Sequence, residues 1–439
     1  MMKMIILSEK WLIRGLSSHR QNSASIIIHY DPSAAPKRRF WLRIGAKDPY
    51  DDYLQNYPRI FGIEQDYRYI YGCFKNIYMR KVLIIALVAF VSCTSKVSDY
   101  PFTIAHRGCW LAAGNGTTVV PENSLDGVRM ASRYGYKAIE LDPHFTRDSV
   151  IVVMHDRSVN RTMCNASDLS DIDSPVNVGE HTFDELRSAY VFKSILPEMR
   201  NQIPTLREML EQCKIEGIIP LMHCDIYEGY PIAKEYFDDD FIAFSSNFDV
   251  LKRVRQISSC KILLDPSNEL KKRGLETNVG NIVSLLEELG GDCGISSMRH
   301  ELCSAEICAG LTSLGYDVQS SIFVTPYELD AVRNGVTILL SDFCWYPSEG
   351  MKPAETASLR VKDEAEWSGE ERECGALVVE MSGKGEWYLT VNGERNYHIC
   401  RETVGTEAVT VRYCRRNATV SLSSVSGDPV RLKIRDYSL

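Results

Sequence analysis

Two carboxylates in the middle of the chain have a spacing that could hold a metal ion. Glu140 and Asp142 lie two residues apart in the β-rich run 137–142, and that spacing places both side chains on one face of a strand. Two carboxylates on one face repel each other unless a positive charge lies between them, and oxygen ligands suit Mg²⁺ or Ca²⁺. The pair therefore predicts a divalent-cation site, with an exposed acidic strand end as the alternative.

A histidine follows each of two further β-rich runs. The run 102–105 leads into His106, and the run 150–154 leads into His155. An imidazole titrates near neutral pH, so it can accept or donate a proton during catalysis. These two histidines are candidate acid and base catalysts.

A short hairpin should bring His155 beside the two carboxylates. Only residues 143–149 separate the second β-rich run from the third, too few for a helical crossover, so we predict antiparallel pairing. With the turn centred on residues 147–148, Glu140 faces His155 across the hairpin. Directly opposed residues share a face of a sheet, which places the imidazole next to the predicted cation.

Strand and helix patterns alternate from residue 100 onward. The predicted strands are 102–105, 137–142, 150–154, 218–225, 240–245, 260–264, 293–296, 316–322 and 336–341. The amphipathic stretches between them are 122–134, 205–215, 247–257, 279–290, 301–314 and 326–334. Such alternation predicts an α/β fold, a (β/α)8 TIM-type barrel over residues 100–346, with the active site at the carboxyl ends of its strands. The run 150–154 belongs to the hairpin, which explains a ninth strand.

Several motifs of this region, taken in order, resemble the opening signature of the glycerophosphodiester phosphodiesterase family. They are His106-Arg107-Gly108, Pro121-Glu122-Asn123-Ser124, Glu140-Leu141-Asp142, Thr146, Asp148, His155-Asp156 and Arg161-Thr162, with further matches at 203–206, 245–249 and 340–342. Each motif is short, but their order makes the match specific. The resemblance covers residues 101–345.

The resemblance implies a role for each of six residues: the metal ligands Glu140 and Asp142, the acid/base pair His106 and His155, the phosphate-holding Arg107 and the substrate-pocket residue Glu122. It also implies hydrolysis of a small-molecule phosphodiester, in which a divalent cation and an arginine neutralise the phosphate. Simpler roles remain open: Arg107 as an ion-pair partner of the carboxylates, Glu122 as a helix-start acid, and Asp156 as a group that only orients His155.

The region of the fourth family strand departs from the family pattern of glutamate, an apolar residue and lysine. Asp225 best fits the glutamate position and is the predicted third metal ligand, while His223, on the same strand face, is the alternative. Tyr227 stands in place of the lysine, and we predict that it contacts the substrate. Losing that lysine removes a positive charge from the pocket, so the head group stays open.

Two other functions are compatible with these residues. One is a cyclising phosphodiester lyase of the same barrel superfamily, in which a substrate hydroxyl attacks the phosphorus. The other is a catalytically decayed surface protein that binds lipid head groups or glycans. A net charge of −8 argues against nucleic acid as a partner.

Residues 79–93 have the pattern of a signal peptide, with a basic start and a short apolar core. Their last four residues, 90–93, resemble a bacterial lipobox, which implies a lipid anchor on Cys93. The sequence thus predicts an exported protein of a bacterial cell envelope, lipid-anchored or periplasmic. We interpret Met79 as the true start and residues 1–78 as a non-native or disordered extension; a genuine cytoplasmic extension is the alternative.

The C-terminal region 351–439 has alternating and β-branched runs that predict a small β-sandwich. Turns are predicted at Asn392-Gly393 and Ser382-Gly383. This domain either packs on the barrel as an accessory or contacts a glycan or cell-surface polymer. Most of the 14 cysteines lie in apolar runs and should be buried thiols, although Cys374, Cys400 and Cys414 are candidates for one disulfide.

Overall fold

The computed structural model describes residues 101–113, 117–297, 299–322, 327–347 and 350–439, and four strands near the N-terminus. The chain divides into two units, Met1–Val97 and Ser98–Leu439. The first contains an antiparallel sheet whose strands follow chain order: β1 (Met2–Leu7), β2 (Lys10–Gly15), β3 (Ala24–Tyr30) and β4 (Phe40–Ala46). No strands had been predicted in this stretch. The predicted signal peptide and Cys93 lie outside the described residues.

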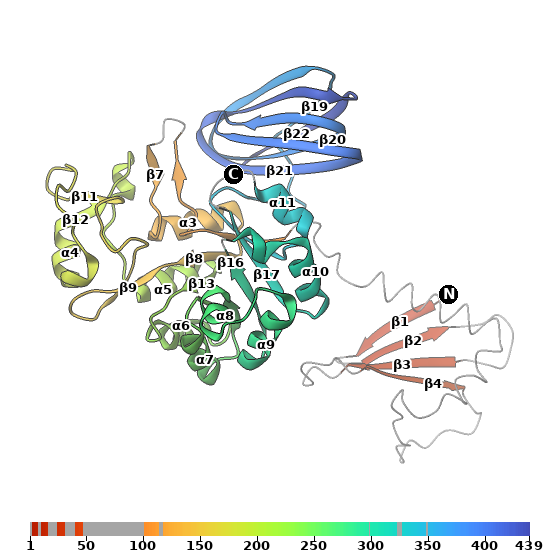
Figure 1. Ribbon diagram of the computed structural model, residues 1–439, viewed down its shortest axis with the longest axis horizontal. Helices are drawn as coiled ribbons and strands as arrows, with labels where there is room; N and C mark the ends of the chain where they lie inside the picture. Colours follow the sequence, from red (N-terminus) through yellow and green to blue (C-terminus); the bar gives the residue numbers. More distant parts are fainter. Residues whose placement is uncertain are drawn as a thin grey trace, which may run out of the picture. The chain divides into compact units, whose positions relative to one another are not determined.

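The second unit contains a closed barrel of eight parallel strands, as predicted (Figure 1). In barrel order they are β5 (Phe102–Ala105), β8 (Ala138–Leu141), β13 (Ile219–His223), β14 (Ile242–Ser245), β15 (Lys261–Leu264), β16 (Cys293–Ser297), β17 (Asp317–Ile322) and β18 (Ile338–Ser341). Because β18 pairs with β5, the last strand of the barrel lies beside the first.

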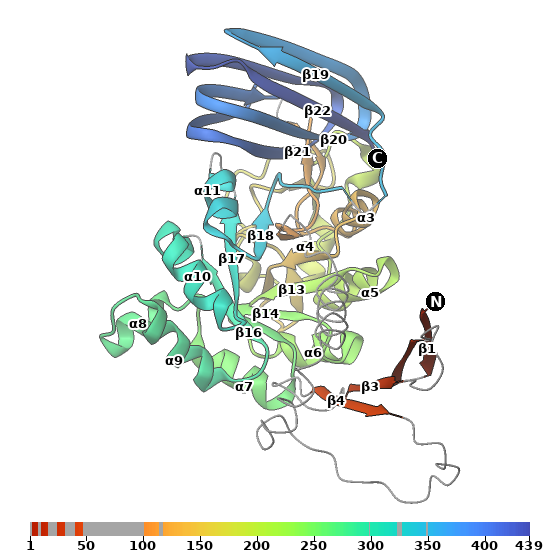
Figure 2. The ribbon, with the colours of Figure 1, turned by 90° about the vertical axis from the view of Figure 1, so that its right-hand side faces the viewer.

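Helices follow the strands and cover the outside of the barrel (Figure 2). They are α3 (Leu125–Tyr134), α5 (Leu206–Glu216), α6 (Gly229–Phe237), α7 (Phe248–Ile257), α8 (Ser267–Arg273), α9 (Val279–Leu289), α10 (Ala305–Ser313) and α11 (Tyr327–Asn334). Helices α6 and α8 had not been predicted. In the described parts of the chain, no helix is long and apolar enough to span a bilayer.

Helix α3 begins three residues later than predicted because Ser124 caps it. The Ser124 hydroxyl accepts a hydrogen bond from the Gly127 amide, which ends the preceding turn and starts the helix. Glu122 and Asn123 therefore lie in the turn before α3 rather than in its first turn. This placement leaves both side chains available to the strand ends.

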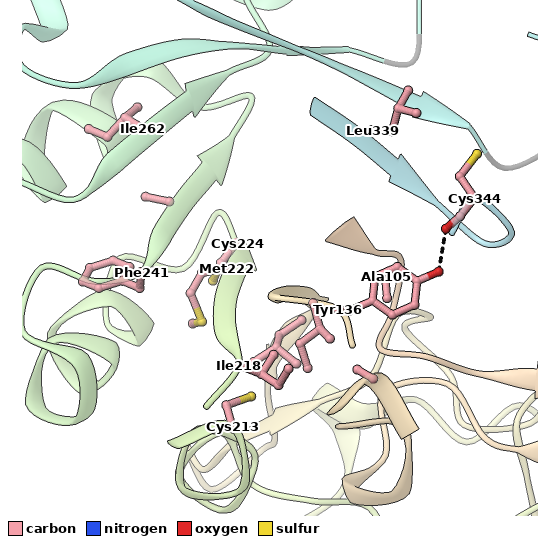
Figure 3. Close-up of a cluster of buried hydrophobic side chains, with 14 of the residues drawn as sticks. Ala105, Tyr136, Cys213, Ile218, Met222, Cys224, Phe241, Ile262, Leu339 and Cys344 are labelled. Carbon is pink, nitrogen blue, oxygen red and sulfur yellow. Dashed lines mark hydrogen bonds between the residues drawn. The ribbon is translucent and has the colours of Figure 1, made fainter. Parts of the chain in front are cut away.

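The barrel has an apolar interior and a larger apolar layer under its helices. Inside, strand residues such as Ile104, Leu221 and Leu263 are fully buried. Between strands and helices, Met222, Cys224 and Phe241 pack together with Cys213 and Ile262 (Figure 3). All described cysteines except Cys400 are buried and none forms a disulfide, so they act as small apolar side chains.

The hairpin predicted around residues 143–149 is present, but its register differs by one residue. A separate strand β9 (Pro143–Phe145) pairs with β10 (Ile151–Val153), so Ile151 lies opposite Phe145. The connecting loop contains a third residue, Ser149, in the left-handed region with φ 64°. The extra loop residue shifts the pairing, and the predicted alignment of Glu140 with His155 was wrong. As predicted, β10 lies outside the closed barrel.

Residues between β10 and α5 form a small lobe that had not been predicted. It contains the two-stranded sheet of β11 (Met163–Asn165) and β12 (Tyr190–Phe192), the helix α4 (Phe183–Ala189) and two 3₁₀ turns, η1 (Val178–Glu180) and η2 (Pro197–Met199). A further 3₁₀ turn, η3 (His300–Cys303), precedes α10, and the short strands β6 (Leu111–Ala112) and β7 (Thr118–Val120) pair before α3.

The C-terminal region is an antiparallel sheet around a second core. Its strands are β19 (Glu355–Val361), β20 (Glu364–Val391), β21 (Arg395–Gly427) and β22 (Val430–Ser438), in the order β19-β22-β20-β21. Glu364 and Tyr388, near opposite ends of β20, both pair with Ser423 of β21, so this long strand must bend. Gly385, at φ 128°, lies at the shifts in register.

Of the two turns predicted in this region, one is present. Asn392 and Gly393 have φ 56° and 68° and connect β20 to β21, as expected for an Asn-Gly hairpin. The prediction for Ser382-Gly383 was wrong, because β20 runs through it with Gly383 opposite Gly405. A Cβ on Gly383 would approach the Val430 side chain to 2.4 Å, so close packing explains this glycine.

The C-terminal sheet packs on the barrel. The Tyr134 hydroxyl, at the end of α3, donates to the Tyr413 carbonyl at 2.9 Å, and the Trp345 indole donates to the Tyr134 carbonyl at 2.7 Å. Both side chains are almost completely buried. The first of these bonds joins the sheet to α3, and the second holds the segment after β18 against the same helix.

Candidate active site

Glu140 and Asp142 lie together at the carboxyl end of β8, as their spacing predicted. They are only 1% and 5% exposed. The adjacent strand β13 pairs Leu221 with Glu140, so His223 reaches the same level of the barrel as Asp142. The His223 Nδ1 atom lies 3.0 Å from Glu140 Oε1 and 3.3 Å from Asp142 Oδ1.

These three residues form a group that could hold a metal ion. One ligand atom from each lies within 4.8 Å of the others. His223, the alternative in the sequence interpretation, occupies the place predicted for Asp225. Strand β13 ends at His223, so Asp225 lies beyond the strand, where alternation of faces no longer applies. Asp225 is exposed and accepts a hydrogen bond from the Ser245 hydroxyl.

Tyr227, the predicted substrate contact, lies further along the same loop. It is half-buried, and the guanidinium of Arg253 on α7 lies 3.7 Å from the centre of its ring. No contact of Tyr227 with Glu140 or Asp142 is present among the described residues. Tyr227 thus contacts α7 and is not part of the candidate metal centre of Glu140, Asp142 and His223.

The charges of this group favour a cation. Burial disfavours the His223 imidazolium, but hydrogen bonds to Asp142 and Glu140 outweigh it and raise the pKa of His223 to about 10. Burial also opposes ionisation of Asp142, yet hydrogen bonds from His223 and Asn123 lower its pKa to about 2. Two buried carboxylates thus require a positive charge, and a divalent cation fits their oxygen and nitrogen donors.

His106 lies at the end of β5 and faces the same group. Its Nε2 is 3.5 Å from Glu140 Oε2, and its Nδ1 is 2.7 Å from Asp342 Oδ1. The indole of Trp110 donates to the same Asp342 oxygen at 2.8 Å. Since a carboxylate only accepts, Nδ1 carries a hydrogen and Nε2 points toward Glu140. Burial opposes protonation, but the carboxylates of Glu140 and Asp342 outweigh it and raise the pKa of His106.

His155 is held by an arginine on one side and a carboxylate on the other. Arg107 donates to its Nε2 at 2.7 Å, which leaves Nδ1 to donate to Asp156 Oδ1 at 2.7 Å. The Arg161 guanidinium binds Asp156 at 2.6 Å, and this hydrogen bond lowers the pKa of Asp156 to about 2. Asp156 therefore orients His155, as one of the sequence alternatives proposed.

Arg107 contacts Glu140 through its backbone and His155 through its side chain. Its amide donates to Glu140 Oε2 at 3.0 Å, and its guanidinium lies 3.4 Å from Glu122. Its φ of 54° is unfavourable for a residue with a Cβ, and such strain often marks functional sites. Glu122 also accepts two hydrogen bonds from Arg161, at 2.8 and 2.6 Å. It therefore binds two arginines and is not an acidic residue in the first turn of a helix.

Sequence reasoning missed two supporting residues. Asn123 had no role of its own in the sequence interpretation, but its amide donates to Asp142 Oδ2 at 2.9 Å, and the residue is fully buried. Asp342 had been quoted only within a motif. It follows the last barrel strand, and closure of the barrel places that strand next to His106. A carboxylate after the eighth strand was therefore the signal that could have identified it.

The fold and site together define a TIM-type barrel with a candidate metal centre at the carboxyl ends of its strands. Residues 106–273 match the model of the glycerophosphoryl diester phosphodiesterase family. That segment contains both histidines, Arg107 and all three potential ligands. Within the barrel, residues 106–273 thus carry a domain of the glycerophosphoryl diester phosphodiesterase type.

Curated relatives match part of the barrel. The chain is 35% identical to glycerophosphodiester phosphodiesterase 1 of Rattus norvegicus over 123 residues, which are 27% of this chain and 32% of that protein. It is 36% identical to a glycerophosphocholine phosphodiesterase of Homo sapiens over 93 residues, 20% of this chain and 13% of that protein. The chain thus spans at most about a third of these relatives.

Two solved structures are similar to a little more than half of this chain. A glycerophosphoryl diester phosphodiesterase from Parabacteroides distasonis aligns with a TM-score of 0.42 and 20% identity, covering 56% of this chain and 84% of that one. A glycerophosphodiester phosphodiesterase from Thermotoga maritima aligns with a TM-score of 0.41 and 19% identity, covering 55% and 95%.

Proposed function

We propose that the chain hydrolyses glycerophosphodiesters to an alcohol and glycerol phosphate, with a divalent cation held by Glu140, Asp142 and His223. One observation carries the proposal: His106, His223 and the Arg107 amide all contact the single buried carboxylate of Glu140. A cation, Mg²⁺ or Ca²⁺, would neutralise a non-bridging phosphate oxygen and so make phosphorus more electrophilic. The curated relatives named phosphodiesterases support the same reaction.

The two histidines have different hydrogen-bond partners, which suggests different roles. His155 Nε2 accepts a hydrogen bond from Arg107, so it holds a lone pair and can take the proton of an attacking water. His106 Nε2 faces a carboxylate, and the raised pKa of His106 favours a proton at that atom. We assign His155 as the base and His106 as the acid that protonates the leaving alkoxide.

Arg107 would bind the phosphate. Its guanidinium lies within hydrogen-bond distance of the base, so an anionic phosphate between them would be fixed beside the nucleophile. Glu122 accepts hydrogen bonds from this guanidinium and is itself held by Arg161.

The test is turnover of glycerophosphocholine and glycerophosphoethanolamine with and without EDTA. His106→Asn and His155→Asn should each lower kcat by about 10²–10⁴-fold. His181→Asn is the matched control, because His181 binds the Asn177 carbonyl outside the site. Phosphorus NMR distinguishes hydrolysis from a cyclising lyase, whose product is a cyclic phosphate. Absence of turnover in the wild type, with binding of the diester retained, would favour the decayed binding protein instead.

For location, we propose export and lipid attachment at Cys93, on the signal-peptide pattern of residues 79–93. Mass spectrometry of the mature protein should find Cys93 acylated at its N-terminus. Detection of a native peptide from residues 1–78 would contradict both cleavage and a start at Met79.

A further inference from the structure

Arg412, in the middle of β21, reaches from the C-terminal sheet into the barrel. Its side chain is buried, with 5% of the residue exposed. One guanidinium nitrogen donates to the main-chain carbonyl of Asp342, and another donates to the Cys109 thiol. Its backbone amide donates to the Phe343 carbonyl at 3.2 Å. The C-terminal sheet therefore binds the segment that follows β18.

This guanidinium is buried without a paired carboxylate. Among the described residues it forms no ion pair, and its nearest aromatic neighbours are Tyr136 and Tyr134, at 5.2 and 5.9 Å from the ring centres. Cys109 is no counter-ion, because burial raises the pKa of its thiol to about 11 despite the opposing effect of Arg412. A buried, unpaired charge costs stability, and an apolar side chain would fill this space at lower cost.

The two groups that Arg412 binds belong to the segment that contains His106 and to the segment that contacts it. Asp342 accepts the Nδ1 hydrogen of His106 through its carboxylate, while Arg412 holds its carbonyl. Cys109 lies three residues after His106 on the same loop. In addition, the His106 amide donates to the Ser341 carbonyl at 3.1 Å. Arg412 thus joins the ends of β5 and β18, the two segments that determine where the imidazole points.

We propose that Arg412 is a positioning residue that holds Asp342, and through it the imidazole of His106, in the orientation that faces Glu140. This inference rests on the proposed function, since it assumes that His106 takes part in catalysis. It makes the C-terminal sheet a required support of the active site rather than a passive accessory.

The kinetic test compares three variants of the full chain. Arg412→Met keeps the length and loses the donors, and we expect kcat to fall about 10–100-fold, as for other residues that orient catalytic groups, with KM changed less than about twofold. Arg412→Lys keeps the charge and one donor group, so it should recover part of kcat.

Arg395→Met is the matched control. Arg395 lies on the same strand, is 3% exposed, and pairs at 3.8 Å with Glu328 on α11. Its guanidinium also covers the Phe343 ring, at 4.0 Å from the centre, but it contacts no described residue of the site. The control leaves the buried Glu328 without its ion-pair partner, so it should lose thermal stability, while kcat stays within about twofold of the wild type. An equal loss of kcat in both variants would overturn the proposal.

Proton NMR supplies a readout that does not depend on turnover. The Nδ1 hydrogen of His106, bonded to a carboxylate, should give a downfield resonance that His106→Asn removes. Arg412→Met should shift or broaden it, and Arg395→Met should not. If the wild type were inactive, the proposed function would fail while this resonance still tested the positioning. An unchanged resonance and kcat in Arg412→Met would refute it; should that variant not fold, Arg412→Lys decides by the same two measurements.

Discussion

Binding of a divalent cation should displace a proton from His223. In the cation-free protein the imidazole lies within 3.3 Å of both carboxylates, and these contacts raise its pKa from 6.5 to about 10. At pH 7 the ring is therefore an imidazolium that occupies part of the cation's place. A cation at Glu140 and Asp142 either uses the imidazole nitrogen as a ligand or repels its charge, and both require loss of the proton.

The proton of His223 and the cation compete for the same site, and this competition sets the number of protons released and the pH dependence of Kd. Between pH 7 and 9 we expect release of about one proton per cation and an apparent Kd that falls about tenfold per pH unit. Calorimetric titration with Mg²⁺ or Ca²⁺ in two buffers of different ionisation enthalpy measures the proton count directly. His223→Gln removes the titrating ring, so its Kd should vary little over the same range. A wild-type Kd independent of pH, with no proton released, would refute the reasoning.

The raised pKa of His223 also determines how the stability of the protein without a cation depends on pH. Because the pKa of His223 is raised on folding, its stabilising effect is complete below about pH 6.5 and is lost as the pH rises toward 10. Since the side chain is 42% exposed, water screens part of the effect. Urea unfolding of the wild type should therefore show a loss of stability between pH 6.5 and 9 that His223→Gln lacks.

Three further changes probe the phosphate contact, the carboxylate support and the C-terminal core. Arg107→Lys should raise KM for glycerophosphocholine about tenfold or more, because an ammonium lacks the planar fork of donors; an unchanged KM would argue against phosphate binding there. Asn123→Ala should weaken cation binding about 10–100-fold by freeing Asp142, which calorimetry measures, whereas equal affinity would make Asn123 purely structural. Trp387→Ala should lower the free energy of unfolding by about 3–5 kcal/mol in urea denaturation, and a loss below 1 kcal/mol would contradict its complete burial.

Features that depend on a few neighbouring residues were predictable from the sequence. The i, i+2 spacing of Glu140 and Asp142 placed both on one face because alternation is a local property of a strand. The hairpin before His155 was equally local, yet its register required knowing that Ser149 adopts a positive φ. A serine in a sequence does not indicate a positive φ as a glycine does, so the predicted loop was one residue shorter than the observed one.

Features that depend on the closed barrel were not predictable in the same way. Whether His223 or Asp225 joins the carboxylates is decided by where β13 ends, and that depends on its pairing with β8 and β14. The contact of His106 with Asp342 spans 236 positions of the chain and exists only because β18 closes on β5. Arg412 approaches from a separate sheet, and no spacing in the sequence links it to His106.

His223 lies in the candidate metal centre where the family pattern has a glutamate, and a neutral imidazole in place of a carboxylate changes how charge is balanced there. A divalent cation between Glu140 and Asp142 would leave the group neutral, whereas a third carboxylate would leave it negative. The phosphodiester brings one negative charge, so this site needs only one further cationic side chain to bind it. Arg107, whose guanidinium lies 2.7 Å from His155 Nε2, is placed to supply that charge.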